Sequence, residues 1–146
     1  MLTDCQGIPY PVYGQGFVKL CKAVTGAVPF GSVYELDIVL PEDAQIPAAG
    51  QFYMLHALRS NTFLGRPISV YHAEKKDGGI FVQFLILVKG KGTKELCSLE
   101  EGDKIILLGP CGNVFPKPEG KKVIIVGGGI GVAPVAGFAE TLEEKS

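Results

Sequence analysis

The stretch SVYELDIVL, residues 32–40, decides the fold of this chain. Its residues alternate in a way that suits a β-strand, in which successive side chains point to opposite faces. One face carries Tyr34, Leu36, Ile38 and Leu40, and the other carries Val33, Glu35, Asp37 and Val39. The pattern therefore predicts a half-buried strand.

Five further segments have the same character, and turn-forming residues separate them. They are residues 16–24, 51–58, 67–73, 79–88 and 103–109. In the first, Phe17 shares a face with Lys19, and Val18 shares the other with Leu20 and Lys22. The sequence KKDGG (75–79) is a strong signal for a tight hairpin. The spacing predicts a mainly β protein, an antiparallel barrel or sandwich.

Composition limits the classes of function. The chain has 146 residues, 47% of them hydrophobic, and its formal net charge is −1, so a packed core is expected and neither a nucleic-acid surface nor a basic membrane patch is indicated. No apolar run approaches the roughly 18 residues that span a bilayer, and the N-terminus does not resemble a secretory signal. We expect a cytoplasmic protein with no nucleic-acid or membrane partner.

The reactive side chains are scattered. Cys5, Cys21, Cys97 and Cys111 lack metal-site spacing, and reduced thiols are favoured over disulfides in a cytoplasmic protein. His56 and His72 are isolated from any acidic or cysteine cluster. Any redox or group-transfer chemistry would therefore be carried by a cofactor, with no catalytic side chain and no metal site predicted.

A short helix is expected after the fifth strand. Thr93 is a suitable N-cap, and KELCSL (94–99) follows it. The glycine-rich turn KGKG (89–92) precedes the cap, so free backbone N–H groups would form a generic anion site.

The character of the chain changes near residue 121. A buried strand is predicted at Val123–Val126, followed by the turn GGGIGVAP (127–134) and a helix. The apolar face of that helix would consist of Val132, Val135, Ala136, Ala139 and Leu142. Such a β-α unit opens a parallel sheet. A single unit cannot complete one, so we expect a truncated domain, with packing of the unit on the barrel as the alternative. The glycines depart from the strict GxGxxG register.

The stretch GRPISV (65–70) places Arg66 directly before Pro67. An arginine offers a planar set of donors suited to phosphate. The simpler interpretation is a strand that begins with a solvated arginine.

In combination, RPIS (66–69), GKGT (90–93), GPCGNVF (109–115) and VIIVGGGIGVAP (123–134) resemble the ferredoxin-reductase-like FAD-binding flavoproteins. Within that family they are similar to the electron transfer subunits of the two-subunit, NAD-linked bacterial dihydroorotate dehydrogenases. The resemblance implies an N-terminal extension (1–13), a six-stranded antiparallel FAD-binding barrel with one short helix (14–118), and the first β-α unit of a truncated NAD-binding α/β domain (119–146).

The resemblance also implies the site residues. Arg66 would pair with the FAD pyrophosphate, Pro67 and Ile68 would shape the wall, and Ser69 would lie near the reactive edge of the flavin ring. Gly92 and Thr93 would bind the pyrophosphate. Leu85, Ile86 and Leu87 would run along the cofactor, where relatives often carry a Tyr-Arg pair. Gly128, Gly129 and Gly131 would contact NAD.

The implied function is an oxidoreductase subunit that passes electrons between a [2Fe–2S] cluster and NAD through FAD. Its partner would be the FMN-containing catalytic subunit that oxidises dihydroorotate in pyrimidine biosynthesis. NAD and the cluster are expected only in the full-length relative, so the isolated chain should not turn over NAD(H). The alternatives are an NAD(P)H-dependent flavin or ferredoxin reductase of another pathway, and a non-catalytic barrel that serves as a binding module.

Overall fold

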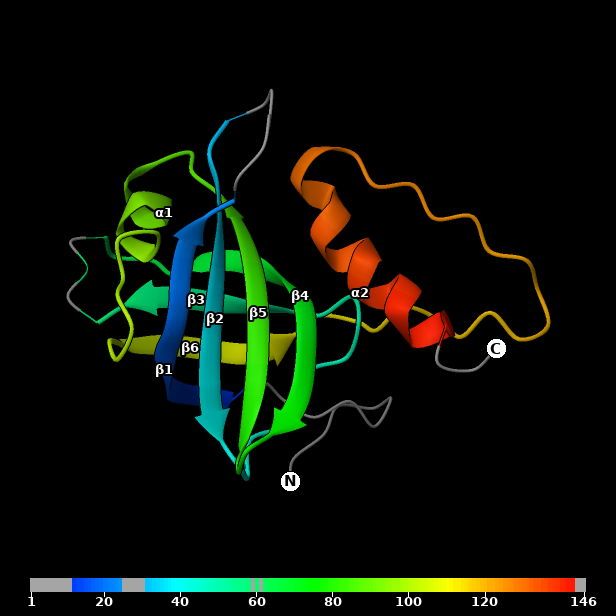
Figure 1. The fold of residues 1–146 in the computed structure, drawn as a ribbon, viewed down its shortest axis with the longest axis horizontal. Helices are drawn as coiled ribbons and strands as arrows, with labels where there is room; N and C mark the ends of the chain where they lie inside the picture. The colour runs from blue at the N-terminus through cyan, green and yellow to red at the C-terminus, as the bar shows by residue number, and fades with distance from the viewer. Residues whose placement is uncertain (1–11, 25–30, 59, 61, 144–146) are drawn as a thin grey trace.

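The computed structural model describes residues 12–24, 31–58, 60 and 62–143. Its strands are β1 (Val12–Ala23), β2 (Val33–Pro41), β3 (Phe52–Ala57), β4 (Arg66–Lys76), β5 (Gly79–Leu87) and β6 (Lys104–Cys111). Its helices are α1 (Lys91–Leu96), the 3₁₀ turn η1 (Gly129–Gly131) and α2 (Val132–Glu143). The strands form a closed antiparallel barrel in the order β1-β2-β5-β4-β3-β6 (Figure 1). The mainly β, six-stranded barrel is confirmed.

The barrel interior is apolar, as the alternation of residues 32–40 predicts. Leu36, Ile38 and Leu40 of β2 are at most 3% exposed. Phe84 of β5 is fully buried and meets the ring of Tyr53 edge-on, with the ring centroids 5.9 Å apart, an arrangement that aromatic pairs favour. Burial raises the pKa of the Tyr53 hydroxyl far above its ordinary value, so this side chain stays neutral.

The first strand departs from the predicted pattern. Val18 is buried and Phe17 is 52% exposed, but the pairing with β2 shifts between Val18 and Leu20. A β-bulge places two residues opposite one and changes which later side chains point inward. Cys21 therefore packs against the core, and the face predicted for Val18, Leu20 and Lys22 is wrong beyond the bulge.

The hairpin between β4 and β5 is as predicted. Lys76 pairs with Gly79, which leaves a two-residue loop. Both loop residues have positive φ, 48° at Asp77 and 76° at Gly78. Such turns match the twist of the flanking strands and favour an Asp-Gly pair.

Helix α1 begins earlier than predicted. Its N-cap is Gly90, and Thr93 is the third residue of the helix, so the assignment of Thr93 as N-cap is wrong. The Thr93 hydroxyl accepts hydrogen bonds from the backbone N–H groups of Lys89 (2.9 Å) and Gly90 (3.0 Å). It also donates to the Gly90 carbonyl at 3.0 Å. Thr93 thus stabilises the first turn from inside the helix.

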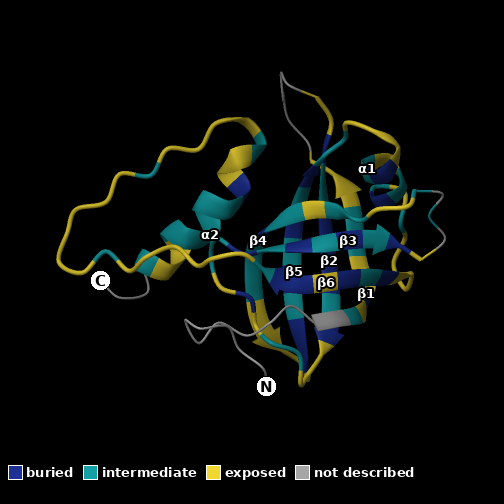
Figure 2. Cartoon of the chain, turned by 180° about the vertical axis from the view of Figure 1, so that it is seen from behind, coloured by how far each residue is buried: buried dark blue, intermediate teal, exposed yellow. Residues whose placement is uncertain are grey.

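The segment after the barrel is only partly regular. Residues 123–126 form no strand, and Ile124 and Val126 are 91% and 83% exposed (Figure 2). The predicted buried strand is therefore wrong: extended backbone becomes a strand only when a neighbour accepts its hydrogen bonds, and no described strand lies alongside.

Helix α2 forms and packs beside β4 (Figure 1). A Cβ atom at Gly137 would lie 2.5 Å from the Tyr71 carbonyl oxygen, so only glycine permits this approach. The ring centroids of Phe138 and Phe115 are 4.9 Å apart. Ala133 is buried whereas Val132 is 43% exposed. The face predicted for α2 is thus not the face that meets the barrel, because small residues allow the closest contact with β4.

The cysteines that the structure describes are free thiols. The Cys21 thiol lies 3.5 Å from the carbonyl oxygen of Cys97 and can donate to it. Burial raises the pKa of the Cys97 thiol to about 12, so it is protonated and poorly nucleophilic at neutral pH. Cys5 lies outside the described residues. Within the described part of the chain, no helix has the length and apolar character needed to cross a membrane.

Candidate functional site

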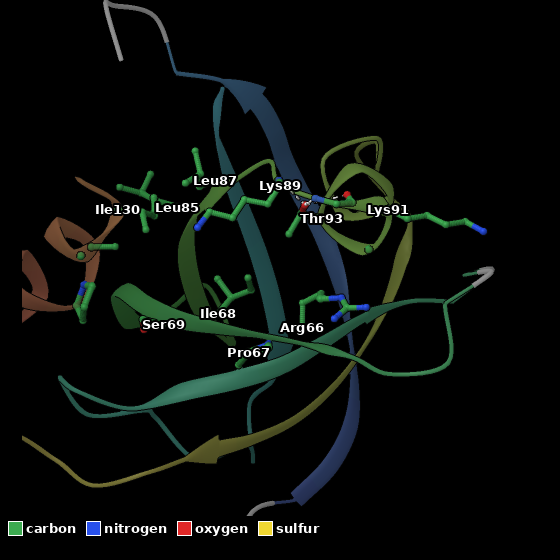
Figure 3. Close-up of a pocket in the computed structure, with 15 residues that line it drawn as sticks. Arg66, Pro67, Ile68, Ser69, Leu85, Leu87, Lys89, Lys91, Thr93 and Ile130 are labelled. Carbon is green, nitrogen blue, oxygen red and sulfur yellow. Dashed lines mark hydrogen bonds between the residues drawn. The ribbon is translucent and has the colours of Figure 1, made fainter. Parts of the chain in front are cut away.

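A pocket of about 610 Å³ lies between the barrel, α1 and the start of α2 (Figure 3). This volume is typical of a small-molecule or cofactor site. Residues from β4, β5, the turn before α1, α1, and the η1–α2 junction line it: Arg66, Pro67, Ile68, Ser69, Leu85, Leu87, Lys89, Gly90, Lys91, Gly92, Thr93, Ile130, Gly131, Ala133 and Pro134.

Arg66 and Gly92 fit each other at one end of the pocket. A Cβ atom at Gly92 would lie 2.4 Å from Nε of Arg66 and 3.1 Å from its Cγ. The arginine side chain thus lies directly against the helix backbone, and only glycine leaves room for it. Arg66 is half-buried, and its guanidinium reaches α1 (Figure 3). A guanidinium can bind a phosphate with two parallel hydrogen bonds.

Strand alternation decides which β5 residues reach the pocket. Leu85 and Leu87 line it, whereas the side chain of Ile86 is 0% exposed in the barrel core. The structure therefore brings together the residues predicted from RPIS, from GKGT and from β5 except Ile86. The side chains of Leu85, Leu87 and Ile68 form an apolar wall.

The pocket is positively charged. Arg66, Lys89 and Lys91 line it, and no acidic residue is among its lining residues. Sequence analysis did not name Lys89, Gly90 and Lys91 individually as site residues, although it indicated an anion site at the KGKG turn. The Thr93 hydroxyl is already hydrogen-bonded to the backbone of Lys89 and Gly90, so the cations are the stronger candidates for binding an anion.

Only part of the glycine turn at residues 127–131 lines the pocket. Gly131 lines the pocket, whereas Gly128 and Gly129 do not. Gly129 has a φ of 56°, which favours glycine there. Ile130, Ala133 and Pro134 close this end of the pocket. Sequence analysis missed them, because α2 had to be docked on β4 before they could face the barrel.

A second cavity of about 1060 Å³ lies between residues 114–123 and α2. Apolar and proline residues form most of it, and its charged residues, Lys117, Glu119 and Lys121, are exposed. A binding site needs polar groups that converge on a ligand. The first pocket meets this condition better.

The cationic and apolar lining residues together suit a ligand with an anionic part and an apolar part. Solved structures with a similar fold include ferredoxin reductases. A ferredoxin reductase of carbazole 1,9a-dioxygenase matches 99% of this chain and 44% of its own chain with a TM-score of 0.75 at 20% identity. A ferredoxin-NADP+ reductase from Neisseria gonorrhoeae with bound FAD and NADP matches 90% of this chain and 52% of its own at a TM-score of 0.67 and 23% identity. The fold is that of the ferredoxin reductases.

Curated relatives narrow the resemblance. The electron transfer subunit of dihydroorotate dehydrogenase B (NAD(+)) from Caldanaerobacter subterraneus is 43% identical over 99 residues, 68% of this chain and 38% of the relative. The subunits of the same name from Clostridium acetobutylicum and Listeria innocua are 46% and 39% identical over 64% and 77% of this chain. No family model matches. The chain is thus related to dihydroorotate dehydrogenase B electron transfer subunits, as its motifs indicated, and it spans about two fifths of their length.

Proposed function

We propose that this chain forms the FAD-binding part of an electron transfer subunit of the dihydroorotate dehydrogenase B type. The observation that carries the proposal is the fit of Arg66 against Gly92 beside an apolar wall. The cradle at Gly92 and the acid-free lining suit the diphosphate of FAD, and Leu85 and Leu87 suit its ring system.

Each wall of the pocket has a distinct task in this proposal. Arg66 binds the diphosphate, and Gly92 leaves the space in which Arg66 lies. Leu85, Leu87 and Ile68 exclude water from one face of the ring. Pro67 restricts the backbone, and Ser69 offers a hydroxyl toward the ring. Bound FAD supplies the exchange of electrons between one-electron and two-electron carriers.

The wider activity that we propose is the one implied by the family resemblance. The whole protein would pass electrons between a [2Fe–2S] cluster and NAD, in the cytoplasm, with an FMN-containing catalytic subunit that oxidises dihydroorotate as its partner. Gly128, Gly129 and Gly131 would approach NAD. We expect negligible NADH oxidation by these 146 residues with added FAD, because they span only about two fifths of the relatives' length. A spectrophotometric assay that shows sustained turnover would contradict this.

The FAD site is tested by titration of the purified chain with FAD, followed by desalting and an absorbance spectrum. Gly92→Ala should displace Arg66 and weaken binding roughly 10- to 100-fold, the equivalent of losing charge-assisted hydrogen bonds worth about 1.5–3 kcal/mol. Arg66→Ala should do the same. Gly14→Ala is the matched control, because its Cβ would meet nothing within 4 Å and Gly14 does not line the pocket. Equal FAD affinity in the parent and Gly92→Ala would refute the site.

An NAD(P)H-dependent ferredoxin reductase of another pathway is the second candidate. The likeness of the fold to ferredoxin-NADP+ reductases favours it. Co-purification of the full-length protein with an FMN-containing dihydroorotate dehydrogenase subunit would support the first candidate. Reduction of free ferredoxin, with no such partner, would support the second.

A further inference from the structure

The two ends of the candidate FAD pocket differ in their chemistry. Arg66 and α1 form one end, where the guanidinium lies against Gly92. At the other end lie Ile130, Ala133 and Pro134, all without charge. Figure 3 shows Ser69, Leu85 and Ile130 on this second side, away from Arg66. If the diphosphate binds at the Arg66 end, the apolar end receives the flavin ring.

Lys89 brings a positive charge to this apolar end. Its side chain runs from the turn before α1 toward Leu85 and Ile130, whereas the side chain of Lys91 extends away from the pocket (Figure 3). Arg66 points to α1. Lys89 is therefore the one cation among the lining residues that is directed at the apolar end.

Hydrogen bonds hold the backbone at Lys89 and just before it. Its own N–H donates to the Thr93 hydroxyl at 2.9 Å. The N–H of the preceding residue, Val88, donates to the carbonyl of Ser32 at 2.9 Å. These hydrogen bonds hold the backbone from which the Lys89 side chain leaves the chain, and the residue itself is exposed.

We propose that Lys89 is a positioning residue that sets the reduction potential of the bound flavin. Flavin gains negative charge on its ring when it is reduced, and a charge near the ring nitrogens tunes the electronics of the cofactor. An ammonium at the ring end stabilises the reduced form more than the oxidised form. This inference rests on the proposed FAD site and goes beyond it by assigning a task to a residue outside the RPIS and GKGT motifs.

The test compares the parent chain with Lys89→Met, Lys89→Arg and Lys94→Met, each loaded with FAD. The affinity for oxidised FAD and the reduction potential, by equilibration with a reference dye, are measured for each. Lys94 is the matched control, because it carries the same charge on α1 but does not line the pocket. Circular dichroism confirms that every variant is folded.

Lys89→Met should weaken binding of reduced FAD about tenfold relative to oxidised FAD, which lowers the potential by about 30 mV for a two-electron couple. Lys89→Arg should keep the parent potential, and Lys94→Met should change it far less than Lys89→Met. If Lys89→Met keeps the reduction potential of the parent, or if Lys94→Met shifts it equally, the inference about Lys89 is overturned and the proposed FAD site is not. Failure of the parent to bind FAD would overturn the proposed function as well.

Discussion

The barrel and the segment after it contain similar apolar sequences, but the barrel buries its apolar side chains and the later segment exposes them. In β2, Leu36 and Ile38 are fully buried, whereas Ile124 and Val126 of the later segment are almost fully exposed (Figure 2). Every barrel strand has a partner on each side because the sheet closes on itself. Residues 123–126 have no described strand beside them. An apolar run thus becomes a buried strand only where its neighbours are present.

The largest expected contrast lies between Phe84 and Ile124. Phe84→Ala should lower the free energy of unfolding by about 3–5 kcal/mol, because it leaves a cavity in a closed core. Ile124→Ala should change it by less than about 0.5 kcal/mol, as at other exposed positions. Urea denaturation of both variants measures the difference. A large loss with Ile124→Ala would show that this segment is buried in solution and would break the comparison.

The contact between the two regions should depend on Gly137. Alanine favours a helix over glycine by about 1 kcal/mol, but the added Cβ would lie 2.5 Å from the Tyr71 carbonyl oxygen. The backbones of α2 and β4 cannot both keep their positions with this Cβ between them. Gly137→Ala should therefore move α2 away from β4 and cost about 1–3 kcal/mol of the free energy of unfolding. Hydrogen exchange should show loss of protection in α2 while the barrel core keeps its own.

Gly128→Ala provides the control for this experiment, since its Cβ would meet nothing within 4 Å. Protection of α2 that is unchanged or increased in Gly137→Ala would mean that the helix does not dock at this point.

The smallest expected effect concerns the ion pair between the regions. Nδ1 of His72 lies 2.8 Å from Oε2 of Glu140, and the two side chains are 32% and 51% exposed. Exposed pairs contribute about 0–1 kcal/mol. His72→Gln should therefore alter hydrogen-exchange protection of α2 by less than about 1 kcal/mol. Lys75→Gln is the control, because Lys75 forms a surface pair with Glu42 at 3.2 Å within the barrel part. Release of α2 in His72→Gln, as complete as in Gly137→Ala, would show that charge holds the regions together.

Local patterns predicted most of the barrel because their physical causes are local. Alternation in residues 32–40 was enough to select the inward face of β2, and the Asp77-Gly78 pair was enough to define a hairpin. The bulge in β1 was not predictable in this way. It depends on how β1 pairs with β2, and the sequence of one strand does not record its register.

The candidate site also has features that the sequence indicated and features that only the tertiary structure shows. The motifs RPIS and GKGT indicated Arg66 and Gly92 through the family resemblance that they carry, whereas the residues alone favoured a solvated arginine and a generic anion site. Their mutual fit, in which Gly92 leaves room for the arginine, links segments far apart in the sequence. Ile86 was included because the family resemblance placed its strand along the cofactor, but alternation in β5 directs its side chain into the core.

The sequence by itself determined the β alternation, the hairpin and the chemical types that surround the pocket, since these depend on neighbouring residues. Tertiary structure decided which side chains share the pocket, which face of α2 meets the barrel, and that residues 123–126 are not a strand. Those outcomes depend on partners across the fold, because a strand needs hydrogen-bonding neighbours and a helix packs where its smallest residues permit the closest contact.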